Sequence, residues 1–418
     1  MATLPQFIDD LPDFPEEVIE QEAFQRRRLF TATVDTYLIL TVGILVAIGL
    51  MMVWSTTFYW SNPQSAMFLQ QLRNAGLGIV IMFILAVIDY RLWRRLAIPM
   101  MSVTILLLLG LIVLPGVQLV YGARRAYFNG AVQPAEIAVL VVTIYMGAWL
   151  TAKQAKLKHL TYGLLPFALL VGTVAGLILL QPDISTAIMV LAVASIMFFL
   201  AGAEWTQIGI ASLAFIVIGA VSITQFDYAR ARVENYFEML RDPLEANDQA
   251  QAAIIGFLNG GIGGVGLGES RQKFEQLPTP HTDSIFAVIG EELGLAGCAL
   301  VVGLYVTLMV RGFRIAKNAP DMFGALLAAG ITISIVLEAL FNIAVMASVV
   351  PFTGVPLPFI SFGGSSLVSG LASVGILVSI SRATARKSIP TRRVNETLSL
   401  PGMRASISRV RQKPTEGE

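Results

Sequence analysis

Apolar stretches about as long as a membrane is thick recur along the chain, and they restrict its fold more than any other feature. A helix that crosses the hydrocarbon core of a bilayer needs roughly 20 apolar residues. About ten such stretches are present: 34–54, 72–89, 98–119, 134–151, 160–180, 184–202, 206–225, 284–310, 322–348 and 364–382. Of the 418 residues, 14% are charged, against about 25% in soluble domains. The sequence therefore predicts an all-α polytopic membrane protein with about ten transmembrane helices.

Basic residues fall in alternate loops and predict the orientation of the chain. The clusters are Arg26–Arg28, Arg91–Arg95, Lys153–Lys158, Arg311–Lys317 and the tail from Arg382 onward. With ten spans they all lie on one side, and cytoplasmic loops carry the excess of Lys and Arg. We therefore expect cytoplasmic termini: an acidic tail over 1–33 without the features of a signal peptide, a membrane domain over 34–383, and a basic, disordered tail over 384–418 on anionic lipid.

A large extracytoplasmic loop is expected over 226–283, between spans seven and eight. It mixes charged and aromatic residues with the glycine-rich run NGGIGGVGLG. That run matches G-x-G-x-x-G, which indicates dinucleotide binding only between a strand and a helix. Since no such unit is predicted, we expect the glycines to let a re-entrant or tightly packed segment approach the bundle. One cysteine and two histidines exclude a disulfide framework and a His-rich metal cluster.

Cationic side chains on the predicted outer side are candidates for binding phosphate. Arg124 and Arg125 lie in YGARRAYFNG, where the positive-inside rule does not place basic residues. Guanidinium groups donate two parallel hydrogen bonds to phosphate or carboxylate oxygens. The long loop adds further cations, for which pairing with local acids such as Glu234 is the simpler interpretation: Arg230, Arg232, Arg241, Arg271 and Lys273.

Two junctions, QPAE at 133–136 and QPDI at 181–184, begin predicted helices on the same side. Proline at the first helical position needs no N–H there, and an acid in the first turn complements the helix dipole. Glu136 and Asp183 are therefore predicted to start helices. Next to the arginines, Gln133 and Glu136 are also candidates for a substrate pocket, in which Glu136 pairs with Arg124 or Arg125.

The stretch LPTPHTDSIFAVIGEELG at 277–294 places three carboxylates at and below the mouth of the eighth span. Asp283, next to His281, is either a helix N-cap or a general base at the membrane surface. Glu291 lies eight residues on, about 12 Å deeper at 1.5 Å per residue. Buried carboxylates within spans are costly and mark partners or function. We assign chemistry to Asp283, and a structural role or a polar network to Glu291 and Glu292.

The segment VPFTGVPLPFISFGGSS at 350–366 is rich in proline and glycine and predicts a rigid, non-helical lip before the last span. Ser365 and Ser366 are candidates for capping that helix or for contacting a substrate. A nucleophilic serine is not favoured, because no base accompanies it.

In this order and spacing, several stretches together resemble the SEDS family of bacterial membrane proteins (shape, elongation, division, sporulation), with FtsW, RodA and SpoVE. They are GARR, QPAEI, QPDISTA, GGIGGVGLGESRQKFEQLP, HTDSIFAVIGEELGLAG and GVPLPFISFGGSSL, and the resemblance covers nearly all of 34–383. SRQKFEQLP and AVIGEELG favour the FtsW-like branch. The resemblance implies a peptidoglycan glycosyltransferase of the bacterial inner membrane, which polymerises lipid II at the outer face and releases undecaprenyl diphosphate.

The resemblance also implies site residues and partners. Asp283 matches the family's essential aspartate, which removes a proton from the acceptor hydroxyl, while Arg124 and Arg125 face the diphosphate. The other candidates for substrate contact are Gln133, Glu136, Lys273, His281, Ser365 and Ser366. A divalent cation, Mg²⁺ or Mn²⁺, is implied without a ligand set. The implied partners are a class B penicillin-binding protein, other divisome or elongasome proteins, and membrane lipids; no nucleic acid is expected.

The chain departs from the family pattern at Ala126, Ala135, Val139, Ser185 and Ser284. Val139 stands where the family has a lysine, one turn after the glutamate. These departures keep open a catalytically weak scaffold for the penicillin-binding protein. A flippase for a lipid-linked precursor is the other alternative, but it would show repeats and midplane charges, whereas the polar residues noted here concentrate at the outer face.

Overall fold

The computed structural model describes residues 35–57, 63–114, 126–127, 132–225, 227–241, 248–275, 277 and 279–387. Within these residues the chain is almost entirely helical, and an isolated antiparallel bridge joins Tyr127 to Val132. Asp35–Ser381 form one compact unit. The remaining residues belong to a second unit, so the predicted tails lie outside the described residues except for 384–387. The all-α fold class is confirmed.

A helix coincides with each of the ten predicted apolar stretches. The long helices are α2 (Thr36–Thr57), α3 (Pro63–Val87), α4 (Arg91–Val113), α5 (Pro134–Lys153), α6 (Leu165–Leu179, extended by a π turn over Leu160–Leu164), α7 (Ile184–Leu200), α8 (Trp205–Gln225), α13 (Gly294–Lys317), α14 (Met322–Met346) and α15 (Gly364–Lys387). Among the described residues, eight segments are long and apolar enough to cross a membrane, while α7 and the Trp205–Val221 part of α8 are shorter apolar helices. The count of ten spans stays a prediction.

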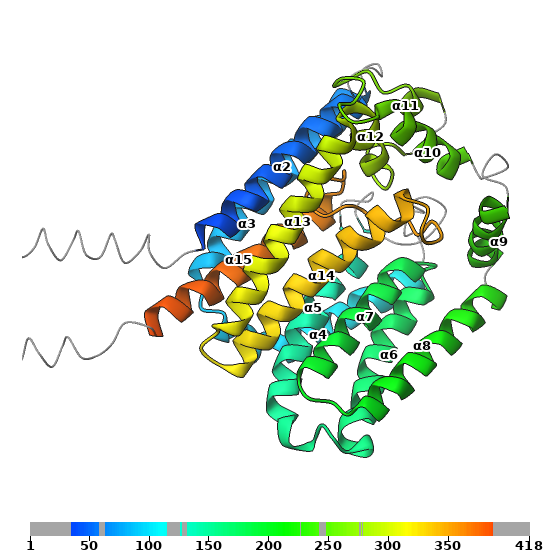
Figure 1. The fold of residues 1–418 in the computed structure, drawn as a ribbon. Coiled ribbons are helices and arrows are strands. Elements are labelled where there is room, and N and C mark those ends of the chain that lie inside the picture. The colour runs from blue at the N-terminus through cyan, green and yellow to red at the C-terminus, as the bar shows by residue number, and fades with distance from the viewer. Residues whose placement is uncertain are drawn as a thin grey trace, which may run out of the picture. The chain divides into compact units, whose positions relative to one another are not determined.

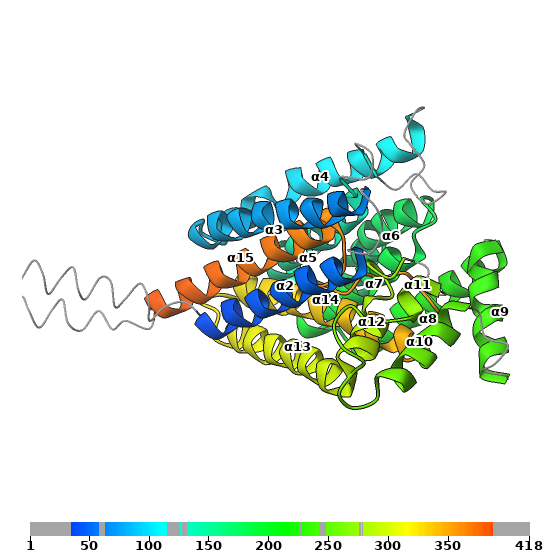
Figure 2. The same cartoon turned by 90° about the horizontal axis from the view of Figure 1, so that it is seen from above.

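The core of the bundle lies around α14, α15 and α5. Their apolar windows are 72%, 61% and 56% buried, whereas those of α3 and α4 are 22% and 28% buried and face outward. Figure 2 shows α5, α14 and α15 between α4 on one side and α13 on the other. The helices that bury most surface are therefore the ones that carry the polar cavity described below.

One end of the bundle is held by polar contacts between helix ends. The hydroxyl of Tyr90, just before α4, donates to Asp321 Oδ2 at 2.7 Å, and Asp321 caps α14 by accepting from the N–H of Gly324 at 2.8 Å. Near the end of α13, Arg311 Nη2 lies 2.9 Å from Asp35 Oδ1. Basic residues of α4 and α13 thus share one end, as the predicted topology requires.

The predicted continuous span 284–310 is wrong, because the structure divides it into α12 (Ile285–Glu292) and α13. The break lies at Gly294, which has a φ of 66°. The glycine-rich run fills the break: Val265 N–H donates to Glu291 O at 3.0 Å, and Leu295 N–H donates to Gly261 O at 2.9 Å. Buried backbone groups freed by a helix break need such partners. The predicted tight packing of the glycine run is confirmed.

The long segment after α8 forms α9 (Asp227–Arg241), α10 (Asp248–Gly260) and α11 (Gln272–Glu275). Figure 1 shows α10, α11 and α12 together at the ends of α2 and α13. A buried network joins them: Glu292 accepts from Ser55 Oγ of α2 at 2.8 Å and pairs with Lys273 Nζ of α11 at 2.7 Å. Glu291 accepts from Ser270 Oγ and from the N–H of Arg271 at 3.2 Å. The predicted polar network is therefore confirmed for both glutamates.

Candidate active site

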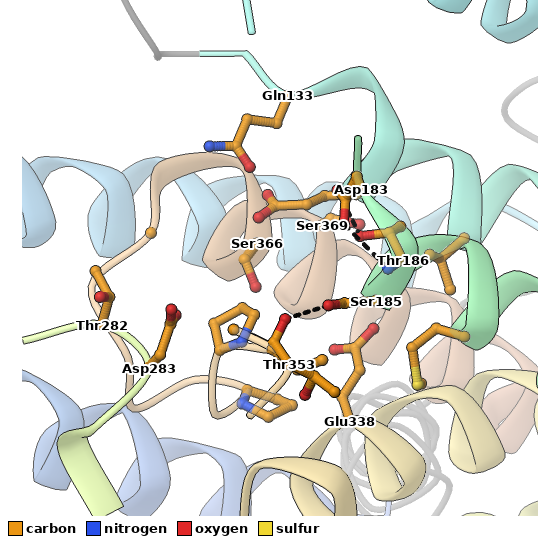
Figure 3. A pocket seen from close by; sticks show the side chains of 18 of the residues that line it. Gln133, Asp183, Ser185, Thr186, Thr282, Asp283, Glu338, Thr353, Ser366 and Ser369 are labelled. Carbon is orange, nitrogen blue, oxygen red and sulfur yellow. Dashed lines mark hydrogen bonds between the residues drawn. The ribbon is translucent and has the colours of Figure 1, made fainter. Parts of the chain in front are cut away.

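A cavity of about 650 Å³ opens among the ends of the core helices. Its walls come from the starts of α5, α7 and α15, from the second half of α14, from the loop before α12, and from the segment 353–363. The lining is rich in carboxylate and hydroxyl groups (Figure 3). The polar and charged residues that line it are Gln133, Glu136, Asp183, Ser185, Thr186, Arg232, Thr279, Thr282, Asp283, Ser334, Glu338, Thr353, Ser366, Ser369 and Ser373.

Asp283 is held by its backbone and points its carboxylate into this cavity (Figure 3). Its carbonyl oxygen accepts from Asn342 Nδ2 of α14 at 2.9 Å. The neighbouring carbonyl of Thr282 accepts from Ser361 Oγ at 2.7 Å. The N-cap position of α12 is occupied by Ser284, so Asp283 lies one residue ahead of its predicted cap position. The loop is therefore fixed from both sides, and the side chain of Asp283 points into the cavity.

The segment next to Asp283 approaches it closely because it contains a glycine. Gly354 has a φ of 71°, and a Cβ placed on it would lie 3.2 Å from Asp283 Oδ2. The preceding carbonyl, that of Thr353, accepts from Ser185 Oγ of α7 and from Arg232 Nη1 of α9, the latter at 3.2 Å. Ser185 is one of the departures from the family pattern, and here it ties α7 to the wall beside Asp283.

Helix starts place two more carboxylates in the cavity. Pro134 is the first residue of α5 and Glu136 lies in its first turn, as predicted. Asp183 is the N-cap of α7 and accepts from Thr186 N at 3.2 Å; the predicted helical position of Pro182 is wrong, because α7 begins at Ile184. The carboxylate of Glu136 interacts electrostatically with the other acids of the cavity. Its Oε2 is buried and lacks a hydrogen-bond partner within the described part of the chain.

Glu338 is a cavity residue that the sequence analysis missed. It lies on α14 inside a membrane-length apolar helix and lines the cavity. The signal was present: a single carboxylate inside an apolar span is costly and usually functional. Ser334, Glu338 and Asn342 are spaced four residues apart, which places them on one face of the helix. The same spacing identifies Asn342, which the sequence analysis also passed over.

The structure brings together Gln133, Glu136, Asp283 and Ser366 from the predicted set of site residues. Ser365 lies just behind them, where its Oγ accepts from Gln133 N–H at 2.9 Å. The predicted capping role of the two serines is wrong, because α15 begins at Gly364 and both lie inside it.

His281 and Lys273 do not line the cavity. The His281 ring meets Phe362 edge-on, with centroids 5.6 Å apart, and burial lowers the pKa of this imidazole below its ordinary value. Lys273 lies in the buried ion pair with Glu292. Arg124 and Arg125 lie outside the described residues, as does their predicted pairing with Glu136. Substrate contact by these four residues remains a prediction.

The described residues contain no group of three or more His, Cys, Asp or Glu side chains that could hold a metal ion. The cavity acids therefore do not form a closed, protein-only cation site. Mg²⁺ is usually bound by one or two carboxylates together with substrate phosphates and water. The expected Mg²⁺ or Mn²⁺ remains a proposal.

Sequence comparison decides the family. Residues 35–386 match the sequence model of the FtsW, RodA and SpoVE proteins, described as cell cycle proteins. The chain belongs to the FtsW/RodA/SpoVE family. Stage V sporulation protein E of Bacillus subtilis (strain 168) is 34% identical to it over 362 residues, which cover 83% of this chain and 97% of that protein. A probable peptidoglycan glycosyltransferase FtsW of Trichlorobacter lovleyi is 37% identical, over 85% of this chain and 95% of that protein.

Solved structures agree with the assignment to the FtsW/RodA/SpoVE family. A chain from a peptidoglycan synthase complex that coordinates polymerization and crosslinking aligns with a TM-score of 0.69 and 30% identity, over 84% of this chain and 98% of that chain. The rod shape determining protein RodA of Thermus thermophilus aligns with a TM-score of 0.63 and 27% identity, over 84% and 97%. The SEDS resemblance is thereby confirmed, and this family member is a multi-pass membrane protein.

Proposed function

We propose that this FtsW/RodA/SpoVE protein is a peptidoglycan glycosyltransferase that polymerises lipid II at the outer face of the inner membrane. The observation that carries the proposal is the Asp283 carboxylate, which opens into a cavity of about 650 Å³ while its backbone is fixed by Asn342. A positioned carboxylate beside a cavity suits general-base catalysis. Membership of a family with named peptidoglycan glycosyltransferases supplies the substrate class.

The proposed reaction needs one base and one departing diphosphate. Asp283 takes the proton of the acceptor sugar hydroxyl, and the hydroxyl oxygen forms a bond to the anomeric carbon of the donor. The bond between that carbon and the diphosphate oxygen breaks, and undecaprenyl diphosphate leaves with the bonding electron pair. The fixed loop of Asp283 supports this role, because a base that is already oriented lowers the barrier to proton transfer.

Charge in the cavity supports a position for the diphosphate. Arg232 is the cation among the described lining residues. A cation attracts a diphosphate strongly where water is scarce. We therefore place the diphosphate near Arg232, and near Arg124 and Arg125 of the predicted site.

A divalent cation, Mg²⁺ or Mn²⁺, fits this proposal as an ion that arrives with the diphosphate. The cavity offers separate carboxylates to such an ion, and substrate phosphate oxygens would complete its coordination. When bound, the ion would neutralise negative charge on the leaving group.

The proposed setting follows from the two ends of the bundle. The end with Arg91, Arg311 and the other basic residues faces the cytoplasm, with both termini, and the cavity faces outward. The structure of a synthase complex that joins polymerization and crosslinking supports a class B penicillin-binding protein as partner, within a divisome or elongasome.

The experiment is polymerisation of purified lipid II by the purified protein with its cognate penicillin-binding protein and Mg²⁺ or Mn²⁺. Asp283→Asn is compared with the wild type, and Glu234→Gln, an exposed acid on α9, is the matched control. We expect the control to make long strands and Asp283→Asn to lose about 100- to 10,000-fold in rate, as for removal of a general base. Near-normal polymerisation by Asp283→Asn overturns the proposal.

A second candidate, a weakly catalytic scaffold for the penicillin-binding protein, is favoured by one observation. Val139 lines the cavity one turn after Glu136 and supplies no charge there, although the family has a lysine at this position. A scaffold needs no base, so Asp283→Asn would then complement a strain that lacks the protein. Failure of Asp283→Asn to complement, with normal membrane levels and normal binding of the penicillin-binding protein, favours the enzyme.

A further inference from the structure

The side chain of Asn342 joins the backbone of Asp283 to the backbone of Val355, which lies in the segment beside the Asp283 carboxylate. Asn342 Nδ2 donates to the carbonyl oxygen of Asp283 at 2.9 Å and to the carbonyl oxygen of Val355 at 2.7 Å. An amide NH₂ group has two hydrogens, and both are used. Since the two partners are carbonyl oxygens, which only accept, the nitrogen of the amide must face them.

The two carbonyls belong to the two backbone segments that meet at the Asp283 carboxylate. One belongs to Asp283 itself, and the other follows Gly354, whose Cα approaches Asp283 Oδ2 so closely that a Cβ would lie 3.2 Å from it. Asn342 therefore fixes the separation between the backbone that carries the carboxylate and the wall against which the carboxylate lies. Its own position is set by α14, the most buried of the membrane-length helices.

The burial of Asn342 makes this arrangement hard to replace. The residue is 1% exposed, so loss of the amide removes the donor that both carbonyls share inside the protein. Its Oδ1 is buried and has no hydrogen-bond partner among the described residues. A buried polar atom without a partner costs free energy. The protein tolerates this cost at Oδ1 of the same amide whose nitrogen makes both contacts.

We infer that Asn342 is a positioning residue for the reaction, which aims the Asp283 carboxylate by holding both of these backbone segments. The inference rests on the proposed function, because it assumes that Asp283 is the base. Asn342 itself does not line the cavity, and it acts on the reaction through Asp283. Misplacement of a catalytic group by about 1 Å costs about 100-fold in rate. Loss of these contacts is therefore expected to lower kcat strongly and to change KM little.

The test compares steady-state constants for lipid II polymerisation by wild type, Asn342→Asp, Asn342→Leu and Asp283→Asn, each on the monodisperse fraction in complex with the penicillin-binding protein. Asn342→Asp keeps the size of the side chain but replaces the donating NH₂ group by an oxygen, and Asn342→Leu replaces the whole amide by an apolar group. Thr332→Val is the control, because Thr332 is equally buried on α14 and donates to Ala328 O of its own helix at 2.7 Å.

We expect both Asn342 variants to lose about 10- to 100-fold in kcat with KM changed by less than about threefold. Thr332→Val should keep wild-type constants. Wild-type kcat in Asn342→Asp, beside an inactive Asp283→Asn, overturns the positioning role and leaves the proposed function intact. A raised KM with unchanged kcat also overturns it, because Asn342 would then serve substrate binding. An active Asp283→Asn overturns the proposed function, and the inference with it.

Discussion

Lys273 Nζ lies 2.7 Å from Glu292 Oε1 in an ion pair whose side chains are 1% and 0% exposed. Removing one partner from a buried pair leaves the other charge without compensation, which costs about 3–5 kcal/mol. Glu292→Gln should therefore lower the free energy of unfolding by about that amount, and thermal melting of the purified protein measures the change. Ser55, which donates to the same carboxylate, cannot supply the missing charge.

The control for this prediction is the pair of Arg230 and Glu234 on α9, whose side chains are 67% and 56% exposed. Exposed pairs contribute about 0–1 kcal/mol, so Glu234→Gln should barely change the melting temperature. Replacing Lys273 and Glu292 together by methionine should recover much of the loss, since buried pairs are often replaceable by apolar groups. Equal melting temperatures for Glu292→Gln and Glu234→Gln would contradict the structural role of the buried pair.

Two adjacent glycines should respond differently to the same substitution. Gly264 has a φ of 80°, and a Cβ there would collide with the carbonyl group of Glu292; Gly263 has open space at its Cβ position. Gly264→Ala is therefore expected to lower the free energy of unfolding by more than about 1 kcal/mol, and Gly263→Ala by less than about 0.5 kcal/mol. Thermal melting of the two variants side by side checks this, and similar losses would speak against the packing of the glycine run at the helix break.

Asp321 makes the stability of the opposite end of the bundle depend on pH. Burial favours the neutral acid, but donation from Gly324 N–H, from the Tyr90 hydroxyl and from Arg91 holds the pKa of Asp321 below its ordinary value. A lowered pKa in the folded state adds stability above the unfolded pKa, about 4, which is lost as pH falls through the folded value. Asp321→Asn keeps the cap oxygen but loses an acceptor for Tyr90.

The melting temperature of Asp321→Asn should therefore lie below that of the wild type from neutral pH down to about pH 4, and the gap should narrow below it. Because the Asp321 side chain is 38% exposed, solvent screens the contact and the gap should be small. A gap that widens in acid would contradict the assignment.

Local sequence rules predicted the helices and several of their ends. Pro134 starts α5 as its fixed φ favours, and Asp183 caps α7. The same rules made one helix of 284–310, because apolar periodicity continues through Gly294. The break there depends on a segment some thirty residues earlier, whose glycines supply the hydrogen bonds that the helix gives up. Such non-local pairing leaves no periodic signal.

The sequence predicted the site residues that belong to recognisable motifs. It did not predict the roles that depend on tertiary contacts. Asp283, Glu136, Gln133 and Ser366 meet in the cavity as expected. The positive charge of Lys273 made it a candidate for binding phosphate. The fold shows that this charge is paired with Glu292 instead.

The carbonyl oxygen of Thr353 is an atom on which three distant parts of the chain converge, since Ser185 of α7 and Arg232 of α9 both donate to it. α7 belongs to the packed bundle, whereas α9 belongs to the segment outside it. The wall beside Asp283 is thus attached to a core helix through Ser185 and to a surface helix through Arg232. A displacement of α9 that moves Arg232 therefore acts on the carbonyl one residue before Gly354, next to the Asp283 carboxylate.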